Sequence, residues 1–213
     1  MTERRGRALP AAFYDRLTEL VARELLGATL ECTMDDGVAS GRIVETEAYL
    51  GPDDPACHAV VGRTERTWHL HGPPGIAYIY FIYGAHWCFN AVTREEGHGS
   101  AVLVRALEPA TGLDLMRRRR GDPRRDADLT NGPGKLCQAL GITGNLDGVR
   151  LDRRPLRILA GPPVADADVV VTPRIGITQA PEWPLRWYVR GSPHVSAART
   201  SPARPRRRSR RTP

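Results

Sequence analysis

The chain has 213 residues, 41% of them hydrophobic and 26% charged, a composition that supports one folded domain with a buried core. It contains no run of about 18 apolar residues, and its first ten residues lack the apolar stretch of a secretory signal. We therefore expect no membrane span and a cytoplasmic protein. The four cysteines form no CxxC pair, which argues against a zinc or disulfide framework and predicts reduced thiols.

The formal net charge of +7 is concentrated at the C-terminal end. Residues 199–213 hold seven of the 31 basic residues and no acid, which leaves 24 basic residues against 24 acidic ones in the rest of the chain. A positive charge is typical of proteins that bind nucleic acid, but a basic surface on the folded part must then be a local patch. We divide the chain into a polar N-terminal extension (1–8), one folded domain (9–197) and a disordered Arg/Pro-rich tail (198–213).

Apolar periodicity predicts the elements of the first half of the chain. Residues 12–27 have apolar side chains at helical spacing and end on a glycine, a natural helix stop. Turn signals at residues 35–37 and at Gly84 each separate two strand-like runs, so we expect two β-hairpins. The paired runs are 28–34 with 38–49, and 76–83 with 85–92.

The second half predicts more strands and two helices. Thr111 and Asp114 form a capping-box pattern ahead of a short helix that ends at Met116. The arginines of residues 117–125 are interrupted by glycine and proline and are expected in a solvated loop. A helix is predicted over 134–141. Strands are predicted over 101–107, 156–161 and 169–178. This mixture predicts an α+β fold: a single domain with a largely antiparallel curved sheet and flanking helices.

One strand carries acidic and aromatic residues together. Period-two alternation places Glu45, Glu47 and Tyr49 on one face, with His58 just downstream. For Glu45 we favour a solvated position on an exposed strand edge. For Glu47, between an apolar run and a Gly-Pro loop, the residues alone leave a functional acid and a solvated surface acid equally open.

Three of the six tyrosines, Tyr78, Tyr80 and Tyr83, lie within six consecutive residues. Packing inside a sheet accounts for Tyr78. It does not account for Tyr83, which directly precedes the hairpin glycine, because the tip of a hairpin is seldom buried. An exposed aromatic residue at a hairpin tip is suited to insertion between base pairs.

Five blocks of the chain are distinctive together: RIVETEAYLGP, GPPGIAYIYFIYGAHWCFN, VLVRALEP, GPGKLCQALGI and PLRWYVRGSPHVS. In this order they resemble the alkyladenine (3-methyladenine) DNA glycosylase family. The resemblance runs from about residue 9 to residue 196. It implies a monofunctional repair enzyme that flips an alkylated or deaminated purine out of double-stranded DNA and hydrolyses its N-glycosidic bond. The implied substrates include 3-methyladenine, 7-methylguanine, hypoxanthine and ethenoadenine. The implied enzyme is a monomer without cofactor or metal, associated with the nucleoid if the source is bacterial.

The resemblance assigns Glu47 as the base that activates the attacking water, and Arg105 as its partner in holding that water. A carboxylate within hydrogen-bond reach takes the proton as the water oxygen approaches the sugar, and its charge stabilises the developing oxocarbenium ion. A purine alkylated at N3 or N7 already carries positive charge, so it is a better leaving group than an undamaged purine.

The resemblance also assigns the residues that hold the flipped base. Tyr49, His58 and Tyr80 match the positions that sandwich the base between aromatic rings, an arrangement that accepts many base shapes. Tyr83 matches the residue that a protruding β-hairpin pushes into the minor groove, where it fills the gap left by the flipped nucleotide. Asn90 matches the position that crowds the exocyclic amine of guanine, so it is expected to exclude undamaged guanine.

Further matches concern the pocket wall and the DNA backbone. Arg174 and Ile175 match a segment whose backbone lines the pocket. Arg63 is expected to contact a phosphate. Lys135 opens the helix predicted over 134–141, where backbone N–H groups and the lysine can meet a phosphate together.

The chain departs from the family pattern in two places. Residues 62–72 read GRTERTWHLHG, where the family has a GRTPR-like run followed by a Met-Phe pair. Glu65 therefore replaces a proline, and residues 68–71 differ throughout. After the tip glycine, Ala85 replaces a larger residue, which predicts a smaller wedge.

Other functions stay open on the sequence. His69 and His71, two residues apart on a possible strand, leave metal binding as an alternative. A zinc deaminase is excluded because the chain has neither an HxE nor a PCxxC sequence. A lyase that nicks the backbone needs an amine nucleophile, and Lys135 is better explained as a phosphate contact. A non-catalytic DNA- or RNA-binding module is the main rival, but such a module has no use for an acid such as Glu47 facing the sugar.

Overall fold

The computed structural model of the chain describes residues 6–196. The predicted N-terminal extension falls mostly outside these residues, and the predicted basic tail falls outside them entirely. Both predictions therefore stay untested by the structure.

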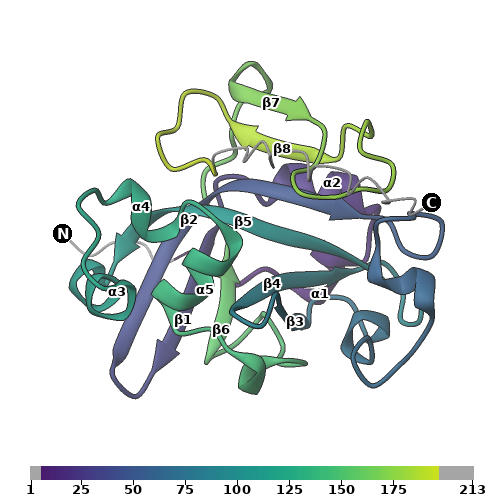
Figure 1. Cartoon of the computed structure of the whole chain (residues 1–213), viewed down its shortest axis with the longest axis horizontal. Helices are drawn as coiled ribbons and strands as arrows, with labels where there is room; N and C mark the ends of the chain where they lie inside the picture. Colours follow the sequence, from purple (N-terminus) through teal and green to yellow (C-terminus); the bar gives the residue numbers. More distant parts are fainter. Residues whose placement is uncertain (1–5, 197–213) are drawn as a thin grey trace, which may run out of the picture.

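One sheet of eight strands organises the described part of the chain (Figure 1), and every strand pairing in it is antiparallel. The strands are β1 (Thr29–Met34), β2 (Gly37–Tyr49), β3 (Ala77–Ile82), β4 (His86–Thr93), β5 (Ser100–Thr111), β6 (Leu156–Leu159), β7 (Val169–Thr172) and β8 (Arg186–Val189). The main order is β3-β4-β5-β2-β1-β6, and β8 pairs with both β2 and β7. The predicted α+β fold with a largely antiparallel sheet is confirmed.

Short helices flank the sheet. The α-helices are α1 (Ala11–Tyr14), α2 (Thr18–Glu24), α3 (Leu113–Arg120), α4 (Ala127–Thr130) and α5 (Pro133–Leu140). Helices α3, α4 and α5 pack on one another and on β2, β4 and β5, and Figure 1 shows them gathered on one side of the molecule. Among residues 6–196, no helix has the length and apolar character needed to cross a membrane. All four cysteines are buried and free of disulfides, as predicted.

Strand β2 is the centre of the fold and changes its partner along one edge. β5 pairs with it along the other edge, whereas β1 pairs with residues 37–42 and β8 with residues 45–47. The register is irregular between Ile43 and Thr46, which marks β-bulges at the change of partner. The sequence did not predict β8. Because β8 covers this edge, the exposed position expected for Glu45 is wrong, and the residue is 0% exposed.

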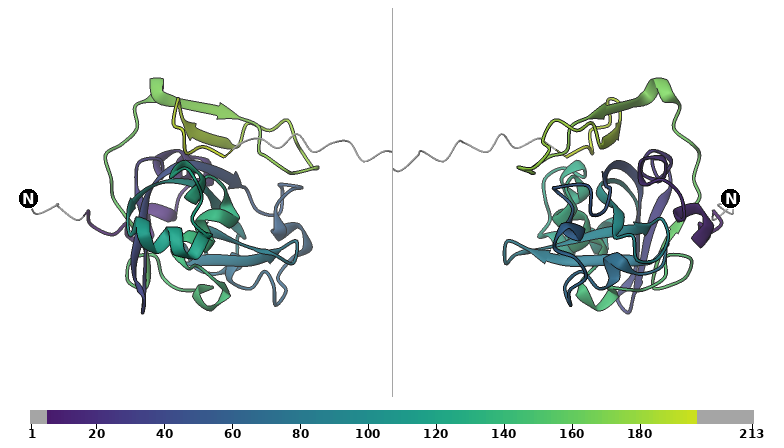
Figure 2. Two further views of the ribbon diagram at one scale, coloured as in Figure 1. Left: turned by 60° about the vertical axis from the view of Figure 1, so that its left-hand side comes forward. Right: turned by 90° about the vertical axis from the view of Figure 1, so that its right-hand side faces the viewer.

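The second predicted hairpin, β3 with β4, projects from the body of the molecule (Figure 2). At its tip Tyr83 and Gly84 both have positive φ angles, 55° and 63°. Tyr83 is 82% exposed. The predicted hairpin and the predicted exposure of its tip are confirmed.

The prediction of one continuous helix over residues 12–27 is wrong. The chain forms α1 and α2, with residues 15–17 between them. In a continuous helix the carbonyl of Tyr14 would accept the N–H of Thr18. Here it accepts the N–H of Arg94, just after β4, at 3.0 Å. This tertiary contact outweighs the local helical preference.

The start of α3 also differs from the prediction. Thr111 is the last residue of β5, and the helix begins after Gly112, which has a φ of 77°. No side chain caps this helix, so the capping box of Thr111 and Asp114 is wrong. The helix continues past Met116 to Arg120, and four arginines expected in a loop are helical.

The arginine-rich stretch is a mixed-charge surface. Three of its six arginines face acidic side chains. The ion pairs join Arg117 to Asp122 and Asp126, Arg119 to Asp36, and Arg125 to Asp128. Exposed pairs of this kind stabilise the fold little, but they cancel much of the local positive charge. Arg120, which is not in any of these ion pairs, lines the cavity described below.

The remaining predicted elements are present with shifted ends. Helix α5 ends as expected before Gly141, which adopts the left-handed conformation of a helix stop. The strand predicted over 169–178 is shorter, because β7 stops at Thr172. Pro173 has no N–H to continue the ladder, and the chain beyond it forms a loop that reaches the candidate site.

Candidate active site

An open cavity of about 900 Å³ lies between β2, β4 and β5 of the sheet and the start of α5. Eight of the ten residues predicted for the site line it. They are Tyr49, His58, Tyr80, Tyr83, Asn90, Arg105, Lys135 and Ile175. Glu47 lies behind this wall and is bonded to three of its members, whereas Arg63 lies outside it. A second cavity of about 430 Å³, beside α1 and α2, contains none of the predicted residues.

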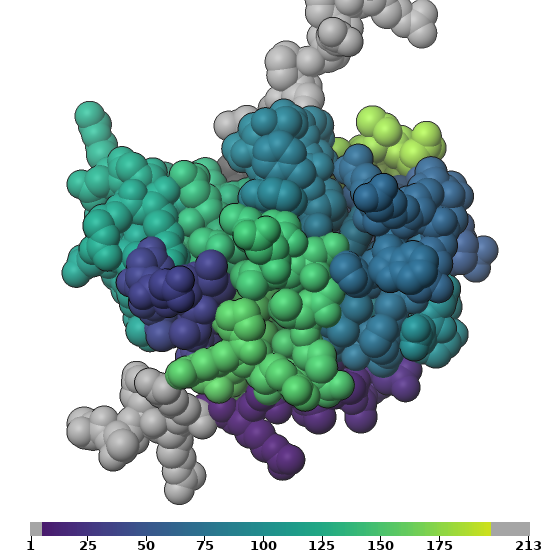
Figure 3. Space-filling view, turned by 90° about the horizontal axis from the view of Figure 1, so that it is seen from below, coloured from purple at the N-terminus to yellow at the C-terminus, as the bar shows by residue number. Residues whose placement is uncertain are grey.

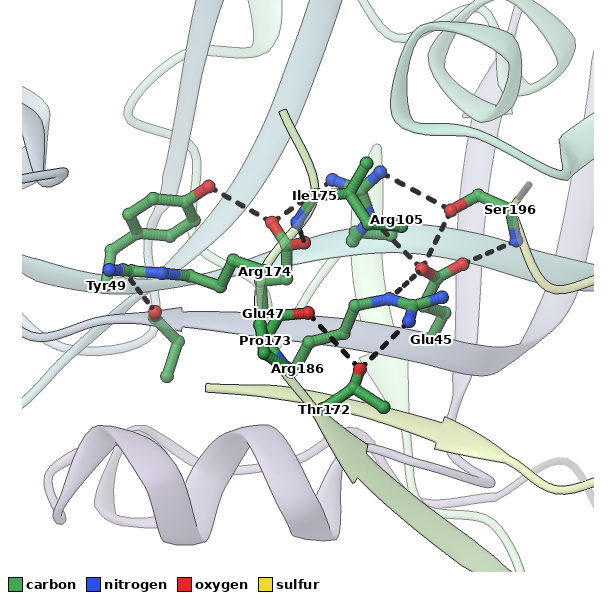
Figure 4. Close-up of polar contacts among 11 residues, drawn as sticks. Glu45, Glu47, Tyr49, Arg105, Thr172, Pro173, Arg174, Ile175, Arg186 and Ser196 are labelled. Carbon is green, nitrogen blue, oxygen red and sulfur yellow. Dashed lines mark hydrogen bonds and ion pairs between the residues drawn. The ribbon is translucent and has the colours of Figure 1, made fainter. Parts of the chain in front are cut away.

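Glu47 is fully buried and surrounded by hydrogen-bond donors (Figure 4). Its Oε1 accepts the backbone N–H of Ile175 at 2.7 Å, and its Oε2 accepts Arg105 Nη1 and the hydroxyl of Tyr49, both at 3.1 Å. A carboxylate offers about four acceptor positions, so one position stays open, on Oε1. Burial raises the pKa of Glu47 above its usual value, although Arg105 and the Ile175 amide oppose the shift.

Arg105 is held between two acids. Its Nε donates to Glu45 Oε1 and its Nη1 to Glu47 Oε2, each at 3.1 Å, and its Nη2 lies 3.4 Å from Ser196 Oγ. Burial alone would lower the pKa of Arg105, but Glu47 and Glu45 more than compensate and raise it. The guanidinium therefore stays charged, and its plane is fixed by two carboxylates.

Glu45 is a member of the site that the sequence did not predict. Its Oε1 accepts Arg105, Arg186 Nε at 2.6 Å and Ser196 Oγ at 2.7 Å, and its Oε2 accepts the N–H of Ser196 at 2.6 Å. Arg186 comes from β8 and is itself buried. Two carboxylates and two guanidinium groups thus form one buried, electrically balanced cluster: Glu45, Glu47, Arg105 and Arg186.

A fully buried ion pair anchors the loop after β7. Arg174 donates through both terminal nitrogens to Asp54, at 2.5 and 2.9 Å. Its guanidinium carbon lies 4.7 Å from the ring centre of Tyr49. The next residue along the chain, Ile175, donates its N–H to Glu47. The pair therefore fixes the backbone that binds the acid, in keeping with the prediction that this segment lines the pocket by its backbone.

Aromatic rings form another part of the wall. The rings of His58 and Tyr80 meet edge to face at 4.5 Å between centres, and His58 Nδ1 lies 2.9 Å from the hydroxyl of Tyr78. Burial, helped by Arg66, lowers the pKa of His58, so its imidazole is neutral at neutral pH. Tyr78 is buried, as predicted, but it also orients a pocket residue.

Asn90 sits deep in the pocket on β4. Its Nδ2 donates to the carbonyl of Tyr78 across the β3–β4 ladder at 3.0 Å. This bond fixes which face of the carboxamide meets the cavity. Cys88, two residues earlier on the same strand, is buried beside it in the wall.

The two predicted phosphate contacts lie in different places. Lys135 is in the first turn of α5, with Nζ 2.6 Å from Asn131 Oδ1, at the rim of the cavity. Arg63 is exposed and is not among the residues that line the cavity, and its guanidinium stacks on Trp68 at 3.8 Å from the ring centre.

His69 and His71 do not share a site. They lie on a 3₁₀ turn, not on a strand. His69 Nδ1 is 2.7 Å from Asp147 Oδ2, while buried His71 uses Nδ1 to reach the carbonyl of Thr67 at 3.0 Å. Seen from below (Figure 3), the green segment around residues 145–155 borders the blue segment that contains the 3₁₀ turn. Across residues 6–196, no group of three or more metal-ligating side chains converges.

The chain matches known proteins along most of its length. Residues 12–193 match the model of the methylpurine-DNA glycosylase (MPG) family. The chain is 52% identical over 193 residues to a protein of Methanoculleus marisnigri. The aligned region covers 88% of this chain and 98% of that protein. It is 50% identical over 205 residues to a protein of Salinibacter ruber, and the aligned region covers 91% of this chain and 98% of that protein. Both relatives are provisionally named 3-methyladenine DNA glycosylase.

Proposed function

The chain belongs to the methylpurine-DNA glycosylase family and is a DNA glycosylase; from this premise we propose that Glu47 activates the water that cleaves the glycosidic bond. The observation that carries the proposal is the buried carboxylate of Glu47, bonded to Ile175, Arg105 and Tyr49 with one acceptor position left on Oε1. A water that donates to this position has its oxygen free to attack.

In the proposed reaction the C1′–N bond of the damaged nucleotide breaks first, and the sugar develops oxocarbenium character. The bonding electrons leave with the purine. A base alkylated at N3 or N7 leaves neutral, whereas hypoxanthine and ethenoadenine leave as anions that take up a proton from solvent. The water oxygen bonds to C1′ while its proton passes to Oε1 of Glu47. A raised pKa makes the carboxylate a better proton acceptor, and its charge stabilises the sugar cation. Arg105, which cannot give up a proton, keeps the carboxylate in place and shares in holding the water.

We propose that Tyr49, His58 and Tyr80 hold the flipped base. All three line the cavity, and neutral His58 can donate or accept one hydrogen bond while its ring packs against the purine. Stacking of this kind suits several lesions, so the proposed substrates are 3-methyladenine, 7-methylguanine, hypoxanthine and ethenoadenine. Asn90, fixed to the neighbouring strand, is proposed to reject undamaged guanine.

We propose that the exposed hairpin tip inserts Tyr83 into the minor groove of double-stranded DNA. Its exposure and its place at the rim of the cavity support this role. Lys135, at the same rim, is proposed to bind a phosphate beside the flipped nucleotide. Arg63 is proposed to contact the DNA backbone farther away. The proposed partner is a DNA duplex with one damaged purine, bound by one copy of the chain.

The test is release of a free base from defined DNA. The full chain is incubated with 25-base-pair duplexes that each contain one 3-methyladenine, hypoxanthine or ethenoadenine, and the released base is measured by chromatography. An undamaged duplex of the same sequence is the control. Binding of the lesion duplexes without any released base would contradict the proposal and favour a module that only binds nucleic acid.

A further inference from the structure

The last residue of the described chain is bound into the buried charge cluster of the site (Figure 4). We propose that Glu45 and Ser196 are positioning residues: together they hold the Arg105 guanidinium in the orientation that Glu47 needs, so that the C-terminal segment completes the active site. This inference rests on the proposed role of Glu47.

The geometry gives Glu45 more partners than a structural ion pair needs. Both of its oxygens are used, by Arg105 Nε, Arg186 Nε, and the hydroxyl and N–H of Ser196. Ser196 is the only one of these partners that binds both oxygens. Its hydroxyl also lies 3.4 Å from Arg105 Nη2, so one serine contacts both members of the Glu45–Arg105 pair.

The need for positioning follows from the shape of arginine. A guanidinium on a long side chain can rotate unless at least two of its edges are bonded. Here the Nε edge is bonded to Glu45 and the Nη1 edge to Glu47. Without Glu45 or the serine that braces it, Arg105 would keep one acid partner and could swing out of plane. Misplacement by about 1 Å near the reacting atoms can slow an enzyme about a hundredfold.

Glu45 also acts on Glu47 through its charge. Several titratable or charged groups face Glu47 from the surrounding elements. They are Glu45 and Tyr49 on β2, Cys88 on β4, Arg105 on β5, Arg174 in the loop after β7, and Arg186 on β8. Glu45 is the other carboxylate of the buried cluster. Its negative charge raises the pKa of Glu47. Removing the charge of Glu45 should therefore lower the pKa of Glu47.

The experiment compares three variants of the full chain with the parent protein. Ser196→Ala removes the hydroxyl and keeps the backbone N–H, while Glu45→Gln removes the charge and keeps the shape. Thr172→Val is the matched control, because the Thr172 hydroxyl bonds to Arg186 at 3.0 Å but touches neither Glu45 nor Arg105. Single-turnover excision of hypoxanthine is measured at saturating enzyme from pH 4.5 to 9, with lesion-duplex affinity and melting temperature for every variant.

We expect Ser196→Ala to excise about tenfold more slowly and Glu45→Gln about a hundredfold more slowly, with lesion affinity within about threefold of the parent. In Glu45→Gln the acid limb of the pH profile should move to lower pH. Thr172→Val should match the parent in excision and in lesion affinity, and any fall in its melting temperature then measures the loss of a bond to Arg186 alone. Parent-like excision by both Ser196→Ala and Glu45→Gln would overturn the inference. So would slower excision with an unmoved acid limb and a loss of affinity, because that pattern means general damage to the fold. If the parent itself releases no base, the proposed function fails first.

Discussion

Replacing Glu47 by glutamine is the sharpest test of the site, because the geometry fixes what the variant loses. The amide oxygen can take the place of Oε2 and keep the bonds to Arg105 and Tyr49. The amide nitrogen then takes the place of Oε1, where it faces the N–H of Ile175 and the open position proposed for water. It can accept no proton there. The variant therefore loses the base and one hydrogen bond, and keeps the pocket.

Two magnitudes follow for Glu47→Gln. Loss of a general base slows a reaction about a hundredfold or more, which corresponds to at least about 2.7 kcal/mol of barrier. The unsatisfied N–H of Ile175 costs roughly 1–3 kcal/mol of folding free energy. The raised pKa of Glu47 works in the opposite direction. The folded state binds that proton more tightly than the unfolded chain, so ionisation of Glu47 costs stability as pH rises through its pKa. Glutamine has no such cost, but it leaves the two guanidinium groups of the buried cluster with one carboxylate. We therefore expect the free energy of unfolding to fall by about 3 kcal/mol.

The assay for Glu47→Gln is single-turnover excision at saturating enzyme, with affinity for the same lesion duplex measured by fluorescence anisotropy. Affinity should stay within about threefold of the parent, since the aromatic wall is intact. Glu108→Gln, an exposed exchange on β5, serves as the control and should change neither quantity. Excision by Glu47→Gln within threefold of the parent would refute the reasoning.

Three further predictions can be checked with the same duplexes. Asn90→Ala should gain weak release of undamaged guanine, because the residue that we propose excludes guanine loses its bulk. Equal exclusion of guanine by parent and variant would leave Asn90 a structural role. Because burial raises the pKa of Glu47, the excision rate should fall with acid at a pH above the ordinary carboxylate value of 4.5, and that limb should vanish in Glu47→Gln. Truncation after Ala198 removes seven arginines but spares Ser196, so excision at saturation should not change, while the slope of log affinity against log salt becomes shallower by roughly 3. Equal slopes for the two forms would contradict a role of the tail in DNA binding and favour a protein partner, or no function, for it.

The elements that the sequence predicted well are those set by neighbours along the chain. Alternating apolar residues and turn glycines suffice for the β1–β2 and β3–β4 hairpins and for α5. The break between α1 and α2 depends on Arg94, which is 80 residues from Tyr14 in the numbering and bonds to its carbonyl. β8 is four residues long, and its place beside β2 is set by tertiary packing. No local sequence pattern predicts the break between α1 and α2 or the pairing of β8 with β2.

The candidate site shows the same division. Alternation along β2 placed Glu47 and Tyr49 on one face. In the structure Tyr49 lines the cavity with Arg105 and Ile175, and Glu47 lies behind them, bonded to all three. Alternation placed Glu45 on that face as well, and this was the one available signal for its role. Its partner Arg186 is 141 residues away, so the sequence could not distinguish a buried acid from a solvated one. The roles of these residues in catalysis stay predictions.

The separation of Glu45 and Ser196 along the chain has a consequence for how the newly made protein folds. Glu45 and Ser196 are 151 residues apart, so a chain still being synthesised cannot join them until Ser196 has been made. Contacts of such long range form late in folding. A nascent chain, or a fragment clipped before β8, would carry the exposed tip and the aromatic wall without a completed charge cluster. Such a product would lack the positioning that we propose for Arg105, so we expect it to excise bases slowly even where it binds DNA.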